Sequence, residues 1–181
     1  MSWPALKKLF SPADFTAYVG GLSFEAWKPQ FVVHHNTASP TVAEWPSVAG
    51  DSRMRGLEKY YSSTPPAGQG WSGGPHLFVA PEGIWAFNPL TEPGVHSPSW
   101  NGISWGVETV GDFSREYLGD AQKENLVSAL ATLHEAAGLD PAHLRFHFED
   151  PATTHRGCPG AHLVKADVIA WVQTRLSPLV T

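Results

Sequence analysis

Short apolar segments rich in β-branched and aromatic residues alternate along this chain with longer segments of helical periodicity. Residues 30–35, Gln-Phe-Val-Val-His-His, have the composition and length of a buried strand. Residues 76–80 and 84–87 are two more apolar runs, and the turn Pro81-Glu82-Gly83 between them predicts a β-hairpin. The same criteria predict strands at residues 103–110 and 143–148.

The helical segments lie between these strands. In residues 121–137, Leu126, Leu130 and Leu133 recur at spacings of four and three, with Asp120 as the expected N-cap and Gly138 as the expected C-cap. Two further helices are expected at residues 53–62, where an apolar side includes Tyr60 and Tyr61, and at residues 161–176. A hairpin forces at least one antiparallel pair, so the order of elements predicts an α/β domain with a central mixed β-sheet flanked by helices.

Length and charge narrow the possibilities further. The 181 residues fit one domain, 1–181, in which we assign no role to residues 1–25. The net charge of −5 argues against the basic face of a nucleic-acid-binding protein. No apolar run approaches the ~20 residues of a membrane helix. The N-terminus lacks the pattern of a secretory signal, so we expect the protein to be made in the cytoplasm. We also expect a monomer, without nucleic-acid or membrane partners.

Three side chains that bind zinc well are expected at strand ends or in loops. Either His34 or His35 ends the first strand, His147 ends the last short strand, and Cys158 follows in a polar turn. Three protein ligands with one open position are typical of catalytic zinc. The alternatives are hydrogen-bonded structural histidines and a cysteine that packs as a small hydrophobe. His155 is a rival for the third position.

Four segments resemble the zinc-dependent N-acetylmuramoyl-L-alanine amidases, which include phage endolysins, cytosolic muropeptide-recycling amidases and peptidoglycan recognition proteins. Residues 31–38, Phe-Val-Val-His-His-Asn-Thr-Ala, resemble the first-strand motif of that family. Residues 95–108 resemble its central block, which ends in glycine, an aliphatic residue and glutamate. Residues 146–150 and 156–160 resemble its His-x-x-Asp block and its block of a basic residue, a ligand, proline and glycine. The resemblance implies the fold of these amidases.

The resemblance also implies a ligand set. Carried over by position, it makes His34, His147 and Cys158 the ligands of one zinc ion. In the family, the first histidine of such a pair points into the site. Because neighbouring residues of a strand face opposite sides, only one of His34 and His35 can easily reach the metal.

Two further positions carry the catalytic roles that the family implies. Glu108 is the expected catalytic carboxylate, which moves a proton from water, made more acidic by zinc, to the leaving nitrogen. Arg156 stands where many relatives have lysine, and it is expected to stabilise the oxyanion together with zinc. The alternatives without a catalytic role are a solvated carboxylate at a strand end for Glu108 and a surface salt bridge for Arg156.

Several other side chains are candidates for the substrate groove. His76 and His96 occupy positions that resemble histidines around the family's cleft, and Trp71 and Trp100 could stack on sugar rings. A structural role is equally open for each, since tryptophan is usually largely buried. Asp150 could orient a ligand histidine or end a turn.

The resemblance implies a peptidoglycan hydrolase that cleaves the amide bond between N-acetylmuramic acid and the L-alanine of the stem peptide. Its partner is then bacterial peptidoglycan or a muropeptide. We expect a bacteriolytic phage or prophage endolysin, which acts on the cell wall after release. The alternatives are a cytosolic recycling amidase, a non-catalytic binding module of the same fold, and a cysteine hydrolase with Cys158 as nucleophile and His147 or His155 as base.

Overall fold

A computed structural model describes residues 5–177. It contains one six-stranded sheet in the order β1-β4-β3-β5-β2-β6. The strands β3, β5, β2 and β6 are parallel, whereas β4 runs antiparallel to both β3 and β1. The strands are β1 (Lys8–Phe10), β2 (Phe31–Asn36), β3 (Leu77–Ala80), β4 (Gly83–Ala86), β5 (Ser104–Thr109) and β6 (Arg145–Phe146).

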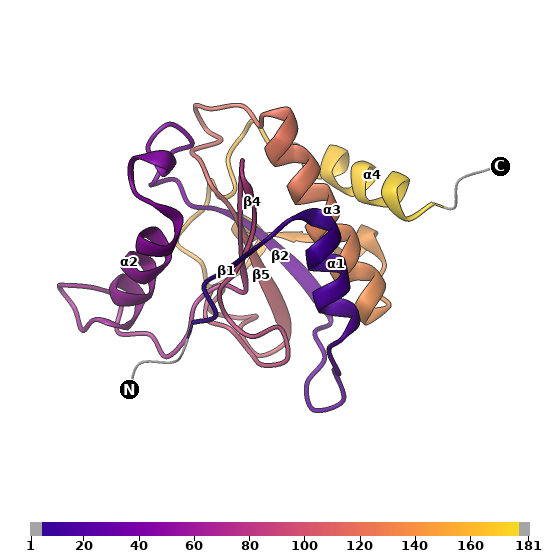
Figure 1. Cartoon of the computed structure of the whole chain (residues 1–181), viewed down its shortest axis with the longest axis horizontal. Helices are drawn as coiled ribbons and strands as arrows, with labels where there is room; N and C mark the ends of the chain where they lie inside the picture. Colours follow the sequence, from indigo (N-terminus) through magenta and orange to yellow (C-terminus); the bar gives the residue numbers. More distant parts are fainter. Residues whose placement is uncertain (1–4, 178–181) are drawn as a thin grey trace.

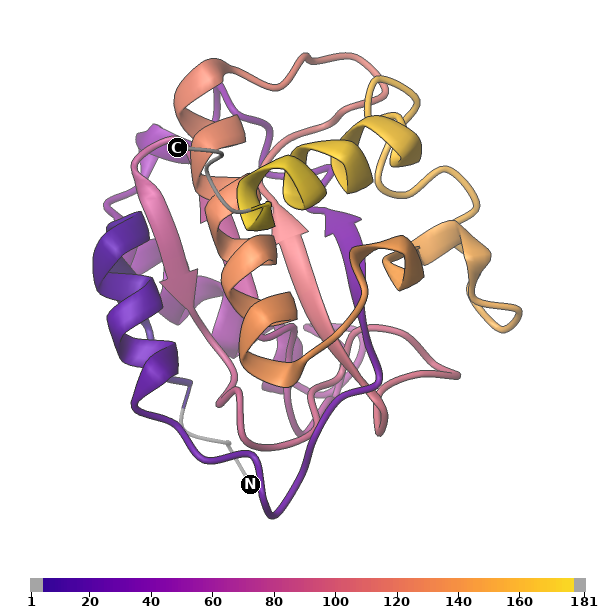
Figure 2. The same ribbon diagram turned by 90° about the vertical axis from the view of Figure 1, so that its right-hand side faces the viewer.

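Helices cover both faces of the sheet. The α-helices are α1 (Pro12–Gly20), α2 (Gly50–Ser62), α3 (Asp120–Ala137) and α4 (Lys165–Leu176), and the 3-10 helices are η1 (Trp45–Ser47), η2 (Pro141–His143) and η3 (His147–Glu149). In Figure 1 the sheet is seen nearly edge-on, with α2 on one side and α1, α3 and α4 on the other. Figure 2 shows these three helices from their own side. The predicted single domain with a mixed sheet flanked by helices is therefore confirmed.

The two faces of the sheet bury two separate apolar cores. On the side of α1, α3 and α4, strand residues such as Val32 and Val107 pack against helical residues such as Leu126. On the side of α2, Met54 packs against Phe78. The strands β2, β3 and β5 are thus largely buried on both faces, which explains why their sequences do not alternate between apolar and polar residues.

The helix α3 matches its prediction closely. Leu126, Leu130 and Leu133 are fully buried, and Gly138 ends the helix in the left-handed conformation, with φ of +60°. One detail of the prediction was wrong, because Gly119 is the N-cap and Asp120 is the first helical residue. The carboxylate of Asp120 still lies in the first turn, where it complements the positive end of the helix dipole.

Two elements near the C-terminus are shorter than predicted. The strand expected at 143–148 is only β6, because the Phe146 N–H donates to the Glu149 carboxylate, at 2.6 Å, and the chain turns into η3. The helix expected from residue 161 begins at Lys165, and the His162 N–H donates instead to the Phe113 carbonyl. The early end of β6 places His147 in a turn rather than in the sheet.

The N-terminal segment forms an additional strand and helix that the sequence analysis did not predict. β1 pairs with β4 at the edge of the sheet, and α1 packs on α3 through Phe15. Ser11 caps α1 by accepting a hydrogen bond from the Asp14 N–H at 3.2 Å. Lys7 Nζ lies 2.7 Å from the Glu58 carboxylate of α2. This segment therefore connects the edge of the sheet with both helical layers.

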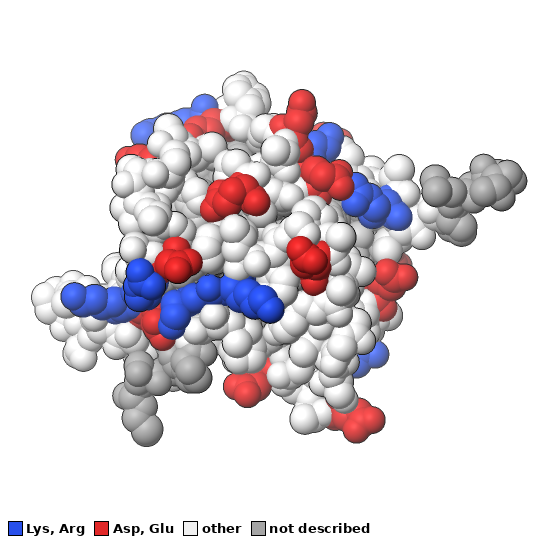
Figure 3. Space-filling view, viewed as in Figure 1, with Lys and Arg blue, Asp and Glu red and all other residues white. Residues whose placement is uncertain are grey.

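The surface carries charges of both signs. Acidic and basic side chains lie interspersed on the face drawn in Figure 3. No helix within residues 5–177 has the length and apolar character needed to cross a membrane.

The burial of Phe15 predicts that the N-terminal helix contributes to the stability of the whole domain. Phe15→Ala should lower the free energy of unfolding by about 3–5 kcal/mol, because it removes a fully buried aromatic side chain. Leu9→Ala is the matched control in the same segment, since Leu9 is 41% exposed, and it should cost about 1 kcal/mol or less. Urea unfolding followed by tryptophan fluorescence measures both. Equal, small effects of the two substitutions would mean that α1 unfolds independently.

Candidate functional site

A cavity of about 1100 Å³ opens on the α2 side of the sheet. Its floor is formed by the carboxyl ends of β2 and β5, which is where ligands usually bind in parallel sheets. One wall is α2 and the loop after it, with Leu57, Tyr60, Tyr61, Gln69 and Trp71. The opposite wall is the loop of residues 152–158. Segments distant in sequence therefore meet around one space.

His35, His147 and Cys158 converge in this cavity. One nitrogen of each histidine and the cysteine sulfur lie within 4.8 Å of one another, close enough for one metal ion to contact all three. Burial, followed by neighbouring histidines, holds the pKa of His35 well below its usual range, and burial lowers that of His147 to about 4. Both rings are thus neutral near pH 7, as metal ligands must be.

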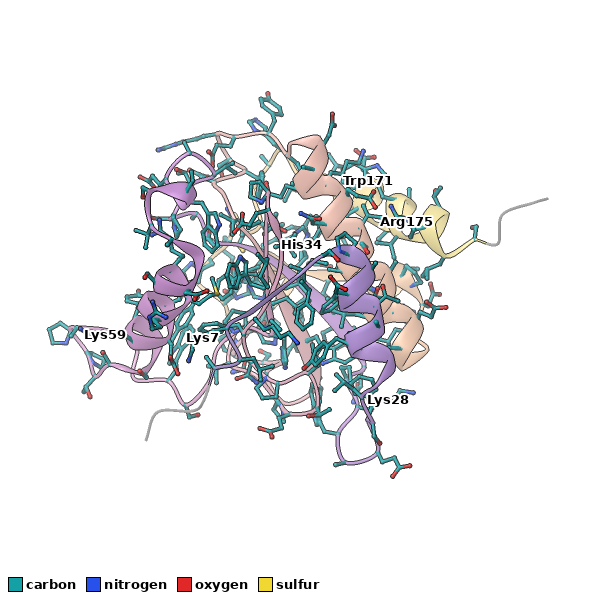
Figure 4. The ribbon with its side chains drawn as sticks, viewed as in Figure 1. Lys7, Lys28, His34, Lys59, Trp171 and Arg175 are labelled. Atoms are coloured by element: carbon teal, nitrogen blue, oxygen red, sulfur yellow. The ribbon has the colours of Figure 1, made fainter. Side chains whose placement is uncertain are left out.

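The predicted first ligand, His34, does not reach this group. Its side chain points to the opposite face of β2, where Nε2 lies 2.7 Å from Thr109 Oγ1 and the ring packs against Phe146. Figure 4 shows His34 in the interior of the molecule. Burial lowers the pKa of His34 to about 3. Of this pair it is therefore His35, and not the predicted His34, that lies beside His147 and Cys158, because strand neighbours alternate in direction and the sequence did not reveal which one faces α2.

Glu108 lies directly opposite His35 in the register of β2 and β5, so both side chains point into the cavity. Glu108 Oε1 is 4.0 Å from His35 Nδ1. Oε2 is buried and has no hydrogen-bond partner among residues 5–177. Burial raises the pKa of Glu108 to about 8. The arrangement gives a carboxyl group that can exchange a proton near neutral pH, next to the candidate metal ligands.

Cys158 and His147 are each positioned by a hydrogen bond. The Asn36 N–H donates to Cys158 Sγ at 3.4 Å, which places the sulfur against the end of β2. Burial, and then the nearby Glu108, raise the pKa of the Cys158 thiol. His147 Nε2 lies 2.9 Å from Thr153 Oγ1, so Nδ1 is its nitrogen outside that hydrogen bond. A metal ligand histidine is typically held in this way through its second nitrogen.

Asp150 connects two loops rather than contacting a histidine ring. Its carboxylate accepts hydrogen bonds from Ser97 Oγ at 2.5 Å and from the N–H groups of Ser99 and Ala152 at 3.0 and 2.8 Å. Burial opposes ionisation, but these hydrogen bonds outweigh it and lower the pKa of Asp150 to about 2. The idea that it orients a ligand histidine directly is not met, and the carboxylate instead holds the loop before β5 against η3.

Arg156 and His155 differ sharply in position. The Arg156 guanidinium donates to the carbonyls of Phe148, Asp150 and Pro151, at 3.4, 3.3 and 3.2 Å, and the residue is exposed and outside the cavity lining. His155 does line the cavity, and its ring stacks on that of His147 with centroids 5.6 Å apart. Of these two neighbours, His155 faces the cavity, and the predicted Arg156 lies outside its lining.

The two histidines predicted for the substrate groove, His76 and His96, also lie in different surroundings. His96 lines the cavity, and its Nδ1 lies 3.1 Å from His35 Nε2. His76 is fully buried and outside the lining, since its Nδ1 accepts from the Gly106 N–H at 3.0 Å and its Nε2 lies 2.9 Å from the Glu92 carbonyl. Of the two alternatives left open for His76, a place in the groove and a structural role, these hydrogen bonds favour the structural role.

Of the two tryptophans predicted for the substrate groove, one lines the cavity and the other does not. Trp71 lines the cavity and stacks on Tyr61, with centroids 5.1 Å apart. Trp100 lies outside the lining and packs edge-on against Phe31. Tyr60 and Tyr61 line the cavity but were not proposed as site residues. In the sequence they were marked only by their position on the apolar side of a predicted helix. A tyrosine buried in the core occupies the same kind of position, so this signal could not identify them.

Comparisons with known proteins place the chain in a family. The sequence model of the family described as N-acetylmuramoyl-L-alanine amidase matches residues 25–161. A search of curated proteins gives no match.

Solved structures with a similar fold include amidases and peptidoglycan recognition proteins. The endolysin amidase LysCS from Clostridium intestinale is 20% identical with a TM-score of 0.60, over 97% of this chain and 91% of that one. The Ph2119 endolysin of a Thermus scotoductus bacteriophage is 24% identical with a TM-score of 0.58, over 83% and 88%. Drosophila PGRP-LB, solved as a Y78F mutant with tracheal cytotoxin, is 22% identical with a TM-score of 0.65, over 92% and 95%. Because the family model spans most of the chain and the fold agrees, this protein belongs to the N-acetylmuramoyl-L-alanine amidase family.

Proposed function

We propose that this protein is a zinc-dependent amidase that cleaves the bond between N-acetylmuramic acid and the L-alanine of the peptidoglycan stem peptide. The observation that carries the proposal is the convergence of His35, His147 and Cys158 beside the Glu108 carboxyl, at the floor of a large cavity. The family match supports the bond that is cut.

The three candidate ligands fit zinc better than calcium or magnesium. Two imidazoles and one thiol form a donor set that zinc favours, and calcium and magnesium prefer oxygen. Three protein ligands leave a fourth position for a water or a substrate atom. A bound zinc ion supplies Lewis-acid polarisation of a carbonyl and the activation of water.

The remaining steps belong to side chains of this protein. Glu108 accepts a proton from the attacking water and delivers it to the leaving nitrogen, for which a pKa of about 8 is well suited. His155 donates a hydrogen bond to the oxyanion from the wall of the cavity, in the role that the sequence had given to Arg156. Tyr60, Tyr61 and Trp71 offer flat surfaces for the sugar and the peptide.

We further propose that the protein acts as an endolysin on the cell wall. The similarity to two endolysins and the compact single domain support this setting. A binding module is the second candidate, because peptidoglycan recognition proteins solved with tracheal cytotoxin share the fold. The complete donor set and Glu108 favour the enzyme.

Mass spectrometry of purified peptidoglycan distinguishes these functions. The zinc-loaded protein should release stem peptides with an L-alanine amino terminus and leave the glycan chains intact. Glu108→Gln should reduce the rate about 10²–10⁴-fold, because it removes the proton acceptor while keeping the shape. Intact peptidoglycan that retains the protein would favour the binding module, and cut glycans would contradict the amidase.

Zinc binding should depend on His35 and not on its neighbour. His35→Ala should abolish the binding of one zinc ion per chain, whereas His34→Gln should retain it, because His34 faces the other side of the sheet. Elemental analysis of gel-filtered protein measures the zinc content, and circular dichroism controls for folding. Loss of zinc in His34→Gln with an intact fold would contradict this assignment.

The adjacent residues His155 and Arg156 should behave differently. His155→Ala should lower kcat about 10²-fold at unchanged zinc content and Tm, as expected for a donor to the oxyanion. Arg156→Ala should mainly lower Tm, by about 2–4 °C if about 1 kcal/mol is lost, because its guanidinium fixes three loop carbonyls. A larger loss of kcat in Arg156→Ala than in His155→Ala would show that the arginine reaches the substrate.

A further inference from the structure

We propose that His96 is a positioning residue that fixes the tautomer and the orientation of His35, so that His35 Nδ1 is the nitrogen presented to the metal. This inference deepens the proposed function and rests on it. It is carried by a continuous line of hydrogen bonds that runs from the backbone of β5 through two buried imidazole rings.

The hydrogen bond between His96 and Ser104 determines which nitrogen donates in each hydrogen bond of this series. His96 Nε2 lies 3.2 Å from the Ser104 carbonyl oxygen, which can only accept, so this nitrogen carries the proton. A neutral imidazole with a proton on Nε2 offers Nδ1 as an acceptor. His96 Nδ1 lies 3.1 Å from His35 Nε2, which must therefore be the donor.

The remaining nitrogen of His35 is then unprotonated. Nδ1 is the atom that lies 4.0 Å from Oε1 of Glu108, which also lines the cavity. Because His35 is 1% exposed and His96 is 7% exposed, water has little access to replace either hydrogen bond. The two rings are nearly perpendicular, at 89°, which holds His35 in one rotational position.

The backbone around His96 is built to hold its ring. The N–H of His96 donates to Asn101 Oδ1 at 2.7 Å. The ring lies against Gly106 of β5, where an added Cβ would come within 2.3 Å of His96 Cγ. Glycine at this position is thus required for the ring to approach the strand. The sequence left His96 as either a groove residue or a structural one, and its hydrogen bonds to Ser104 and His35 suggest this more specific role.

Zinc affinity tests the inference without measuring turnover. In a chelator competition assay, His96→Ala should bind zinc about 10–100-fold more weakly than the natural protein, the effect typical of removing a partner of a ligand histidine. His96→Asn should recover part of the affinity, because its amide oxygen can take the place of Nδ1 as acceptor. His134→Ala is the matched control, since His134 is equally buried, with its Nδ1 bonded to the Leu130 carbonyl on α3. It should leave zinc affinity unchanged.

The tautomer gives a second readout, whose first measurement uses the natural sequence. Nitrogen-15 NMR of the metal-free protein should show His35 protonated on Nε2. Gly106→Ala, which displaces the His96 ring but leaves every ligand in place, should produce a mixture of tautomers. Protonation of His35 on Nδ1, or equal zinc affinity in His96→Ala and the natural protein, would overturn the inference. Zinc bound with the expected tautomer but no cleavage of peptidoglycan would instead overturn the proposed function alone.

Discussion

The parallel, in-register pairing of β2 with β5 determines which side chains can meet in the cavity. It sets His35 opposite Glu108, and the pleat of the sheet points both toward α2. The same pairing sends His34 and Val107 into the other core. A shift of β2 by one residue in this register would turn His34 into the cavity and His35 toward the other core, while Glu108 on β5 kept its place. The chemistry of the site thus depends on the hydrogen-bond ladder between two strands.

The remaining site residues come from the loop between β6 and α4, which is organised by polar contacts rather than by an apolar core. Asp150 accepts hydrogen bonds from two loops, and Arg156 donates to three carbonyls of its own turn. Thr153 holds the ring of His147. These contacts satisfy backbone and side-chain groups that would otherwise be costly to bury beside the cavity. They explain how an irregular segment can hold side chains in fixed positions at the cavity.

Much of the fold could be predicted from the sequence because apolar periodicity reports directly on burial. The hairpin, the long helix α3 and the strands β2 and β5 followed from it. The strand β1 could not, since three residues at the edge of a sheet carry too little apolar signal, although Ser11 and Pro12 do mark the start of α1. Within the site, the residue types that bind metal were recognised. The choice between His34 and His35 was not, because both faces of this strand are buried and alternation then has no visible polar side.

His155 and Arg156 show that the direction of a side chain in a turn is equally hard to predict from the sequence. The resemblance to a family assigns a role to a position, but the direction of a side chain in a loop depends on which carbonyls lie within its reach. Arg156 finds three of them on the outside of the turn. Tyr60 and Tyr61 were missed for a related reason, since a tyrosine that lines a cavity and one that fills a core have the same place on an amphipathic helix.

The separation of the two cores by the sheet has a consequence for how this protein can change. The β-sheet lies between the cavity and the core residues beneath α1, α3 and α4. Substitutions in that core therefore alter stability without touching the cavity. Those beneath α2 alter the shape of the wall that a ligand would meet. One layer can therefore be redesigned for resistance to heat while the other is diversified for new ligands, and combinations across the sheet should be nearly additive.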